Sequence, residues 1–406
     1  MKFLFLFALK NITRQKRRTI LTSSVIAIAI IFFIIITSLL KGFYDVSFEN
    51  ELNFNTSHMK IRSIKYDEDK PFEIDNYMKN YRYVIERIKN FNFIKGFTEI
   101  ISFNGEIDNS INTRFVIIMG VNYKTIDSVF VFKDFIIEGS FDKEGIIVGK
   151  DIAKDMNIDT GSSVFLTFRR KDMIESIEFI VSGIISSPNP LVNRNYVYMD
   201  IEKAKDILGV DAITEIAIKT DDYNRCDKYA EIIGREIKDV KVFNWVILAK
   251  DFLQMAQAKA KGNGFLIFFI AIIGFVGVVN TTMISVYEKR REIGTLKTLG
   301  MREKDIVLLF LIECFLIGLI GVLTGLIFGS ILNLYFVLKG IDLVSKTGFE
   351  DINVGYRVLG IVKSRWDTPL ITIASLLSIL FTTIAGYIPA RKGAKMEPAE
   401  SLRVIQ

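Results

Sequence analysis

The chain has 406 residues, half of them hydrophobic, and a net charge of +6 at pH 7. With its positive mean hydropathy, it is too large and too apolar for one ordinary soluble domain. Its two cysteines, Cys226 and Cys314, lie in segments of different polarity and are not expected to pair, which excludes a disulfide-stabilised secreted scaffold.

Charged residues avoid four long segments, which we predict to be transmembrane helices. These are residues 19–40, 264–286, 306–338 and 368–390, and each is long enough to cross a bilayer. The first segment is too long for the apolar part of a signal peptide, and no small-residue cleavage site follows it. We therefore expect an uncleaved, multi-pass membrane protein.

The distribution of basic residues predicts the orientation in the membrane. Residues 1–18 carry only basic charges, the segment 287–305 and the tail 391–406 are net basic, and residues 41–263 are net acidic. Basic residues concentrate on the cytoplasmic side, so both termini and the segment 287–305 are predicted to lie in the cytoplasm. The large domain is then extracytoplasmic. A nucleic-acid partner is not expected, because such proteins gather their charge on one folded surface.

The segments that flank the first two spans have helical periodicity. In residues 1–18, Phe3, Leu4, Phe7, Ala8 and Ile12 are expected to share one face that lies on the inner leaflet. Apolar residues also recur at helical spacing after the first span and before the second. Two such extensions are predicted to pack as a stalk, with two ordinary surface helices as the alternative.

The region between the stalk segments is predicted to be α+β. Period-two and helical patterns predict strands at 57–64, 93–103, 113–119, 163–169, 177–185, 214–219 and 240–243, with helices at 75–90, 201–208 and 222–237. The simplest description is a strand-helix-strand unit interrupted by a β-rich insertion at about residues 104–195. Two subdomains are expected.

The sequence offers no catalytic, metal or cofactor site. His58 is the only histidine, so no histidine pair is available for zinc, and nothing supplies the geometry of a Ser-His-Asp triad. Residues 145–151 superficially resemble a phosphate loop, but the glycine spacing is too short and Asp151 stands where Ser or Thr would hold magnesium. We expect a non-enzymatic chain that binds no cofactor itself.

Between the second and third predicted spans lies a short charged segment, residues 287–305, with apolar residues at helical spacing. We expect an amphipathic cytoplasmic helix that a soluble partner can push. Its candidate coupling residues are Glu288, Arg290, Arg291, Glu292, Ile293, Gly294, Leu296, Leu299 and Gly300.

The third span combines a buried charge with a glycine ridge. Gly318, Gly321, Gly325 and Gly329 allow close helix packing, against the first span, the fourth span or another protein. Glu313 is costly inside a membrane unless it is paired or near the headgroups. Its two interpretations are a gate or contact with the coupling segment, and a carboxylate that snorkels to the cytoplasmic boundary.

Several motifs together resemble one transporter family along essentially the whole chain. Residues 285–300, SVYEKRREIGTLKTLG, resemble the ER-x-x-EIG-x-x-(K/R)-x-LG segment of the MacB, LolC/LolE and FtsX group of ABC transporter permeases. Residues 389–403 resemble the closing signature of this group, and residues 146–164 resemble its aqueous insertion. The resemblance implies a bacterial inner-membrane protein with a MacB-like periplasmic core domain, an FtsX-like permease domain at about 264–402, and mechanotransmission from a cytoplasmic ATPase.

The implied partners follow from the same resemblance. They are a cytoplasmic ABC ATPase dimer that binds Mg-ATP, a second permease copy or a homologous permease, membrane lipid, and lipoprotein cargo with a periplasmic chaperone as a further candidate. Residues 7–11, 40–43 and 56–61 resemble the LolC/LolE lipoprotein-releasing branch, with Ser57 in place of a glycine. Only residues 169–175 separate two predicted strands where that branch carries a chaperone-recruiting hook, so a long hook is not expected.

Three functions remain open at this stage: lipoprotein release, MacB-like export of peptides or drugs, and FtsX-like regulation of a cell-wall hydrolase. Lipoprotein release is favoured on the branch resemblance. An acyl chain needs an apolar lining, since each buried methylene contributes about 0.8 kcal/mol. The predicted cargo path along the first two spans and the stalk is lined by Phe43, Phe48, Phe252, Met255, Phe268 and Phe269.

Overall fold

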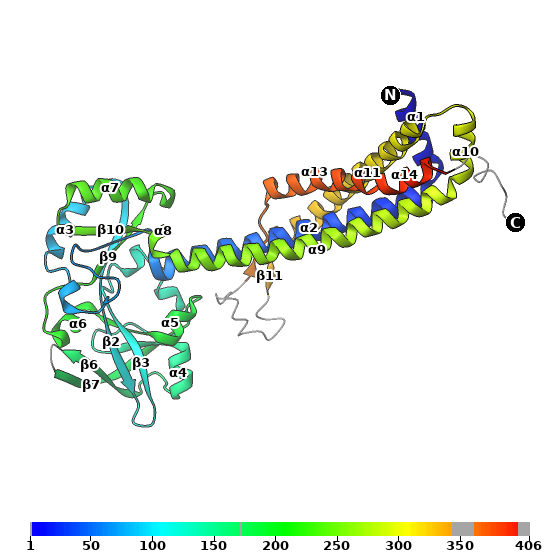
Figure 1. Ribbon diagram of the computed structural model, residues 1–406. Coiled ribbons are helices and arrows are strands. Elements are labelled where there is room, and N and C mark those ends of the chain that lie inside the picture. Colours follow the sequence, from blue (N-terminus) through cyan, green and yellow to red (C-terminus); the bar gives the residue numbers. More distant parts are fainter. Residues whose placement is uncertain (1, 171–172, 343–360, 397–406) are drawn as a thin grey trace. The chain divides into compact units, whose positions relative to one another are not determined.

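The computed structural model describes residues 2–170, 173–342 and 361–396 of the chain (Figure 1). The chain divides into two compact units, which are described separately. The helical unit comprises residues 1–44, 257–346 and 360–406, and the sheet unit comprises residues 45–256 and 347–359. Helices α2 (Lys16–Glu51) and α9 (Lys250–Glu288) each contribute residues to both units.

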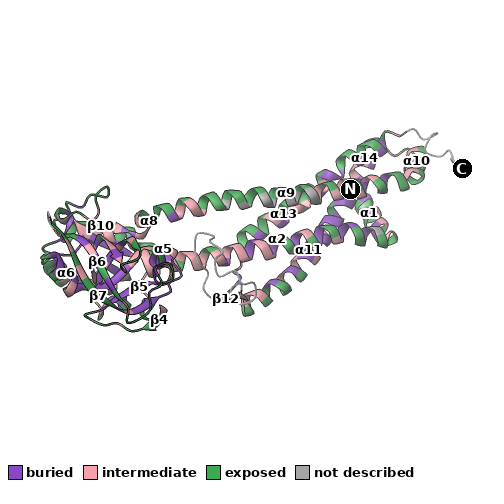
Figure 2. Cartoon of the chain, turned by 90° about the horizontal axis from the view of Figure 1, so that it is seen from below, coloured by how far each residue is buried: buried purple, intermediate pink, exposed green. Residues whose placement is uncertain are grey.

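Long helices build the helical unit. Besides its parts of α2 and α9 it contains α1 (Lys2–Arg14), α10 (Arg290–Thr298), α11 (Glu303–Lys339), α13 (Thr368–Ala385) and α14 (Tyr387–Ala394). Two short strands, β11 (Ile341–Asp342) and β12 (Ile361–Val362), pair antiparallel. Figure 2 shows long exposed stretches on α9, α11 and α13. Large apolar side chains such as Phe328 and Leu376 are exposed there, as expected of helices that face lipid.

Three stretches of helix in the described part of the chain have the length and composition to cross a membrane. They are Thr19–Thr56, Glu303–Lys339 and Thr368–Ala394, and they contain the first, third and fourth predicted spans. The second predicted span, residues 264–286, lies within the unbroken helix α9, several of whose side chains are outside the described set. The total of four spans stays a prediction.

The glycine ridge of α11 packs mainly against the chain's own α2. A Cβ at Gly321 would lie 2.8 Å from the Cβ of Ile26, and one at Gly325 would lie 2.7 Å from the Cβ of Ile30. Gly329 approaches Ile34 in the same way, whereas Gly318 faces Thr382 of α13. The predicted ridge therefore has partners within the chain, its first and fourth predicted spans, because only glycine lets these backbones approach so closely.

Helix α1 differs from the sequence prediction. Leu4, Ala8 and Ile12 are buried in the core of the helical unit, and α1 packs along α11. Phe3 is 71% exposed, so it does not share the buried face. The buried stripe repeats every four residues and covers protein rather than a bilayer surface, because α11 supplies an apolar partner.

The sheet unit is built around one ten-stranded sheet. Its strands are β1 (Met59–Ser63), β2 (Ile94–Asp108), β3 (Thr113–Val121), β4 (Ile136–Gly139), β5 (Ile146–Gly149), β6 (Ser163–Arg170), β7 (Met173–Ile185), β8 (Tyr196–Asp200), β9 (Glu215–Thr220) and β10 (Val240–Asn244). They are ordered β10-β1-β9-β2-β3-β8-β5-β7-β4, and β6 pairs with β2 and β7.

The strand-helix-strand unit and the β-rich insertion, which were predicted to form two subdomains, share one strand, β2. The strand continues to Asp108, five residues beyond its predicted end at Phe103. It pairs with β9 over Ile94–Ile100 and with β6 over Gly105–Asp108. One strand therefore supplies backbone hydrogen bonds to the strand-helix-strand unit and to the β-rich insertion.

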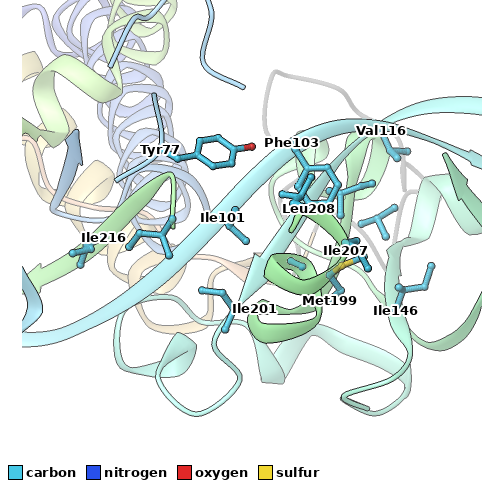
Figure 3. Close-up of a cluster of buried hydrophobic side chains, with 14 of the residues drawn as sticks. Tyr77, Ile101, Phe103, Val116, Ile146, Met199, Ile201, Ile207, Leu208 and Ile216 are labelled. Carbon is cyan, nitrogen blue, oxygen red and sulfur yellow. The ribbon is translucent and has the colours of Figure 1, made fainter. Parts of the chain in front are cut away.

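Side chains on opposite faces of the sheet enter different cores. The larger core lies beneath α3 (Tyr81–Ile88), α4 (Lys150–Met156), α6 (Ile201–Leu208) and α7 (Cys226–Glu236), and Figure 3 shows part of it. The smaller core contains Ile100, Val121 and Tyr198, with Val192 from α5 (Pro190–Asn195). The α+β prediction is confirmed, although the predicted helix 75–90 begins only at Tyr81.

Two local predictions concern the β-rich half. Strands β6 and β7 pair up to Arg170 and Met173, leaving only residues 171–172, outside the described set, between them. A long hook is therefore absent from this hairpin, as expected.

Residues 145–151, which superficially resemble a phosphate loop, contain the end of a buried strand. Gly149 ends β5, and a Cβ there would lie 2.3 Å from the carbonyl oxygen of Asn193. This glycine serves close backbone packing rather than phosphate binding.

Candidate coupling site

The predicted coupling segment forms a short helix between two long ones. Helix α9 ends at Glu288, Lys289 interrupts the helix, and α10 runs over Arg290–Thr298. The chain then turns at Gly300, whose φ of +89° favours glycine, and enters α11 at Glu303. Glu303 and Asp305 lie in the first turn of α11, where negative charge stabilises the helix dipole.

One face of α10 is buried in a small apolar core. Ile293 is 1% exposed and packs with Val286, Ile306 and Phe310, together with alanines of α14. Gly393 of α14 makes this packing possible, since a Cβ there would lie 2.5 Å from the Cγ1 of Val286. The coupling segment therefore packs against the C-terminal motif at residues 389–403, although about a hundred residues separate the two in sequence.

A buried ion pair fixes the start of α10 to α11. The Nζ of Lys289 donates to both carboxylate oxygens of Glu313 at 2.8 Å, and the Nδ2 of Asn11 in α1 donates to Glu313 Oε1 at 2.6 Å. Lys289 is 3% exposed and Glu313 is 2% exposed. Removing one partner from a buried pair leaves an uncompensated charge, at a typical cost of about 3–5 kcal/mol.

This arrangement decides between the two interpretations of Glu313. The carboxylate does not snorkel to a boundary, because it is buried and held by Lys289 and Asn11. It contacts the coupling segment, which was the first interpretation. A role as a gate stays a prediction.

A second polar link joins α10 to α14. The Nζ of Lys297 donates to the carbonyl oxygens of Ala394 at 2.8 Å and Met396 at 2.9 Å. Ala394 is the last residue of α14 and Met396 follows it closely, and a positive charge is favourable at this end of a helix. Helix α10 is therefore anchored at its start to α11 and near its end to α14.

The opposite face of α10 is exposed. Arg291 and Glu292 are exposed, Leu299 is 79% exposed, and Glu288 and Gly300 are also exposed. Arg290 is half-buried and Leu296 is partly buried, while Ile293 and Gly294 face inward. The predicted coupling residues thus divide into an outward set available to a partner and an inward set that positions the helix.

Sequence reasoning missed the residues that hold this segment in place. Lys289 stands in a run of charges, and nothing in the run distinguishes it from its neighbours. Asn11 and Lys297 likewise carry no local signal. The one available clue was Glu313 itself. The two predicted spans beside the coupling segment carry no other charge, so a carboxylate buried there requires a cation from another part of the fold.

The residues of the predicted cargo path lie in different surroundings. In the sheet unit, Phe252 is 7% exposed, and Phe48 and Met255 pack against it. The ring of Phe48 contacts Trp245 with centroids 4.9 Å apart. In the helical unit, Phe43 is half-buried and Phe268 is 60% exposed, whereas the side chain of Phe269 is outside the described set. The cargo path stays a prediction.

Among the residues that the structure describes, no group of three His, Cys, Asp or Glu side chains could hold a metal ion.

The fold and the coupling site together define a class of protein: a membrane protein of long apolar helices with a folded α+β unit. Its short amphipathic helix is fixed by buried polar links and keeps one face exposed.

Comparison with known families places the chain more closely. Residues 19–236 match the MacB-like periplasmic core domain, and residues 264–398 match the FtsX-like permease C-terminal region. The chain belongs to the family of ABC transporter permeases that combine these two parts.

Individual relatives are distant. The lipoprotein-releasing system transmembrane protein LolC of Xylella fastidiosa is 26% identical over 68% of this chain and 70% of its own length. An uncharacterized ABC transporter permease of Methanocaldococcus jannaschii is 26% identical over 98% of this chain and 96% of its own length. The crystal structure of the periplasmic region of MacB from Actinobacillus actinomycetemcomitans, 13% identical, covers 50% of this chain and 94% of that one, with a TM-score of 0.35.

Proposed function

We propose that this chain is the membrane subunit that transmits ATP-driven movement from a separate cytoplasmic ATPase to the far side of the membrane. The observation that carries the proposal is the geometry of α10. Its exposed face presents Arg291, Glu292 and Leu299, and the Lys289–Glu313 pair and Lys297 anchor it at both ends. A push on a helix held in this way moves α11 and α14 rather than bending a free loop.

The cargo we propose is a lipoprotein, which the chain releases from the membrane together with a second permease. Similarity to LolC of Xylella fastidiosa and to LolE of Haemophilus influenzae, at 26% and 23% identity, supports this assignment. A MacB-like export function is the second candidate. It is supported by 32% identity to the macrolide export protein MacB of Psychrobacter cryohalolentis over a third of this chain.

The test of the coupling role is charge reversal on the exposed face of α10. Arg291→Glu combined with Leu299→Asp should abolish co-purification of the ATPase from native membranes, because both side chains are exposed where a partner would dock. Lys10→Glu is the matched control, a charge reversal on an exposed site of α1. Retained ATPase association in the double variant would contradict the assignment of α10.

The cargo is tested separately. A photo-crosslinker at Phe268, which is exposed, should capture acylated protein during turnover. Capture of a soluble peptide or drug would favour the exporter instead. Capture of phospholipid alone, while lipoprotein release proceeds, would exclude this face from the cargo path.

A further inference from the structure

The sheet unit contains a cavity of about 190 Å³ that is lined by none of the predicted site residues. Its floor is the face of the sheet that carries Ser102, Met119 and Tyr198, on β2, β3 and β8. Aromatic side chains from outside the strands also line it, among them Phe54, Phe72, Phe130 and Phe132.

One end of the cavity is polar and charged. Lys60 and Arg62 of β1 point to the same face as Glu215 of β9. The Lys60 Nζ lies 2.6 Å from Glu215 Oε1, and the Arg62 Nη2 lies 2.7 Å from Glu215 Oε2. Burial alone would raise the pKa of Glu215, but the charges of Lys60 and Arg62 lower that pKa to about 2. The Glu215 carboxylate is therefore ionised, and each of its oxygens contacts one of the two cations.

The polar end has more hydrogen-bond donors than acceptors. Lysine and arginine side chains only donate, and each of these two has N–H groups beyond those that contact Glu215. The lining holds two cations against one anion. Glu51 and Glu68 add negative potential at Lys60 and Arg62 respectively, but neither side chain lines the cavity. An acceptor-rich group would complete this end of the cavity.

Away from the charged end, the lining is mainly apolar and aromatic. Tyr198 lines this part of the cavity from β8, which three strands separate from β1, and its ring contacts Phe132 with centroids 4.6 Å apart. An apolar group joined to the acceptor would fill this part of the cavity.

We propose that this cavity binds a small organic anion, a single carboxylate carried on one aromatic ring or a short aliphatic chain. Lys60 and Arg62 bind the carboxylate through N–H groups that do not contact Glu215, and the aromatic side chains of the lining contact the apolar part. A cavity of about 150 Å³ already holds one benzene ring, and drug-sized ligands need more than about 300 Å³. The volume therefore selects a ligand of about this size. The site is independent of ATPase coupling.

The direct test uses phenylacetate and its neutral isostere phenylacetamide with the full chain in lipid nanodiscs. Saturation-transfer NMR, with empty nanodiscs subtracted, should show phenylacetate binding at least about tenfold more tightly than phenylacetamide, because only the anion gains charge-assisted hydrogen bonds. Equal affinities for the two probes would overturn the proposal. So would the absence of phenylacetate binding at about 10 mM.

One variant locates the site and has a matched control. Lys60→Met should weaken phenylacetate binding roughly tenfold and leave phenylacetamide binding unchanged, whereas Lys205→Met removes a buried, ion-paired lysine outside the cavity and should change neither.

Melting curves of the same samples confirm that each variant folds. Equal phenylacetate affinity in Lys60→Met and Lys205→Met would overturn the proposal. If Lys60→Met fails to fold, the comparison of phenylacetate with phenylacetamide in the unmodified chain decides.

Discussion

The ion pair between Lys289 and Glu313 is a buried polar link of the coupling site, with both side chains almost fully inaccessible to solvent. Asn11 adds a hydrogen bond to the same carboxylate. Such a pair contributes little net stability compared with apolar residues, but its geometry is specific. Its function would then be to fix the position of α10 rather than to add stability.

Lys289→Met should therefore lower the free energy of unfolding by about 3–5 kcal/mol, because Glu313 remains as a buried charge without its cation. Combining it with Glu313→Gln should restore most of the loss, since the glutamine can still accept from Asn11. Thermal unfolding of the full chain in nanodiscs measures both. Lys304→Met, at an exposed site, is the control, and equal melting of all three variants would show that the pair is not buried as described.

We expect the stability of the sheet unit to depend on pH because of His58. Its Nδ1 accepts a hydrogen bond from the backbone N–H of Thr220 at 3.1 Å. Burial, with a smaller contribution from Lys219, lowers the pKa of His58 from 6.5 to about 4. Below pH 6.5 the unfolded chain takes up a proton that the folded chain does not, so stability is highest above pH 6.5 and falls towards pH 4.

The expected loss is about 1–2 kcal/mol after allowing for the partial exposure of the ring. His58→Asn keeps an acceptor for Thr220 and does not titrate, so its melting temperature should depend less on pH between 7.5 and 5. Glu215, with its pKa of about 2, loses its contribution only at lower pH. An unchanged pH dependence in His58→Asn would assign the effect to another group.

At the scale of elements, the close contact between α11 and α2 depends on glycine. A Cβ at Gly325 would lie 2.9 Å from the carbonyl oxygen of Ala27, and backbone cannot move aside as a side chain can. The contact has no hydrophobic drive within a bilayer, so it depends on this complementarity.

Gly325→Ala should destabilise the helical unit by about 1–3 kcal/mol through overpacking. Gly264→Ala is the matched control, because nothing lies within 4 Å of a Cβ at that position of α9. The control should be neutral or slightly stabilising, since alanine favours helix more than glycine. The measurement is the melting temperature of each variant in the same lipid. Equal destabilisation would mean that the ridge does not form the contact.

At the scale of the whole molecule, the remaining question is which side of the membrane each unit occupies. The basic termini and the basic segment 287–305 predict that α10 is cytoplasmic and that the sheet unit is extracytoplasmic. Single cysteines in a Cys226→Ser background can report this. A membrane-impermeant thiol reagent added outside should label Asn109→Cys and not Thr295→Cys. Outside labelling at position 295 would reverse the topology.

The sequence alone determined the features that depend on local periodicity. Runs without charge located the apolar helices, period-two alternation located most strands, and the spacing of residues such as Ile293 and Leu296 predicted an amphipathic coupling helix. Such patterns are visible because neighbouring positions on one element share one environment.

Only the tertiary structure decided the contacts between distant segments. It paired Glu313 with Lys289 and with Asn11, 302 residues away, and it placed Gly325 against Ile30. It also joined the two halves of the sheet through β2, and placed Lys60, Arg62 and Glu215 together in one cavity. Periodicity shows which face of an element is buried but not which partner covers it, because the partner is selected by packing and charge across the whole fold.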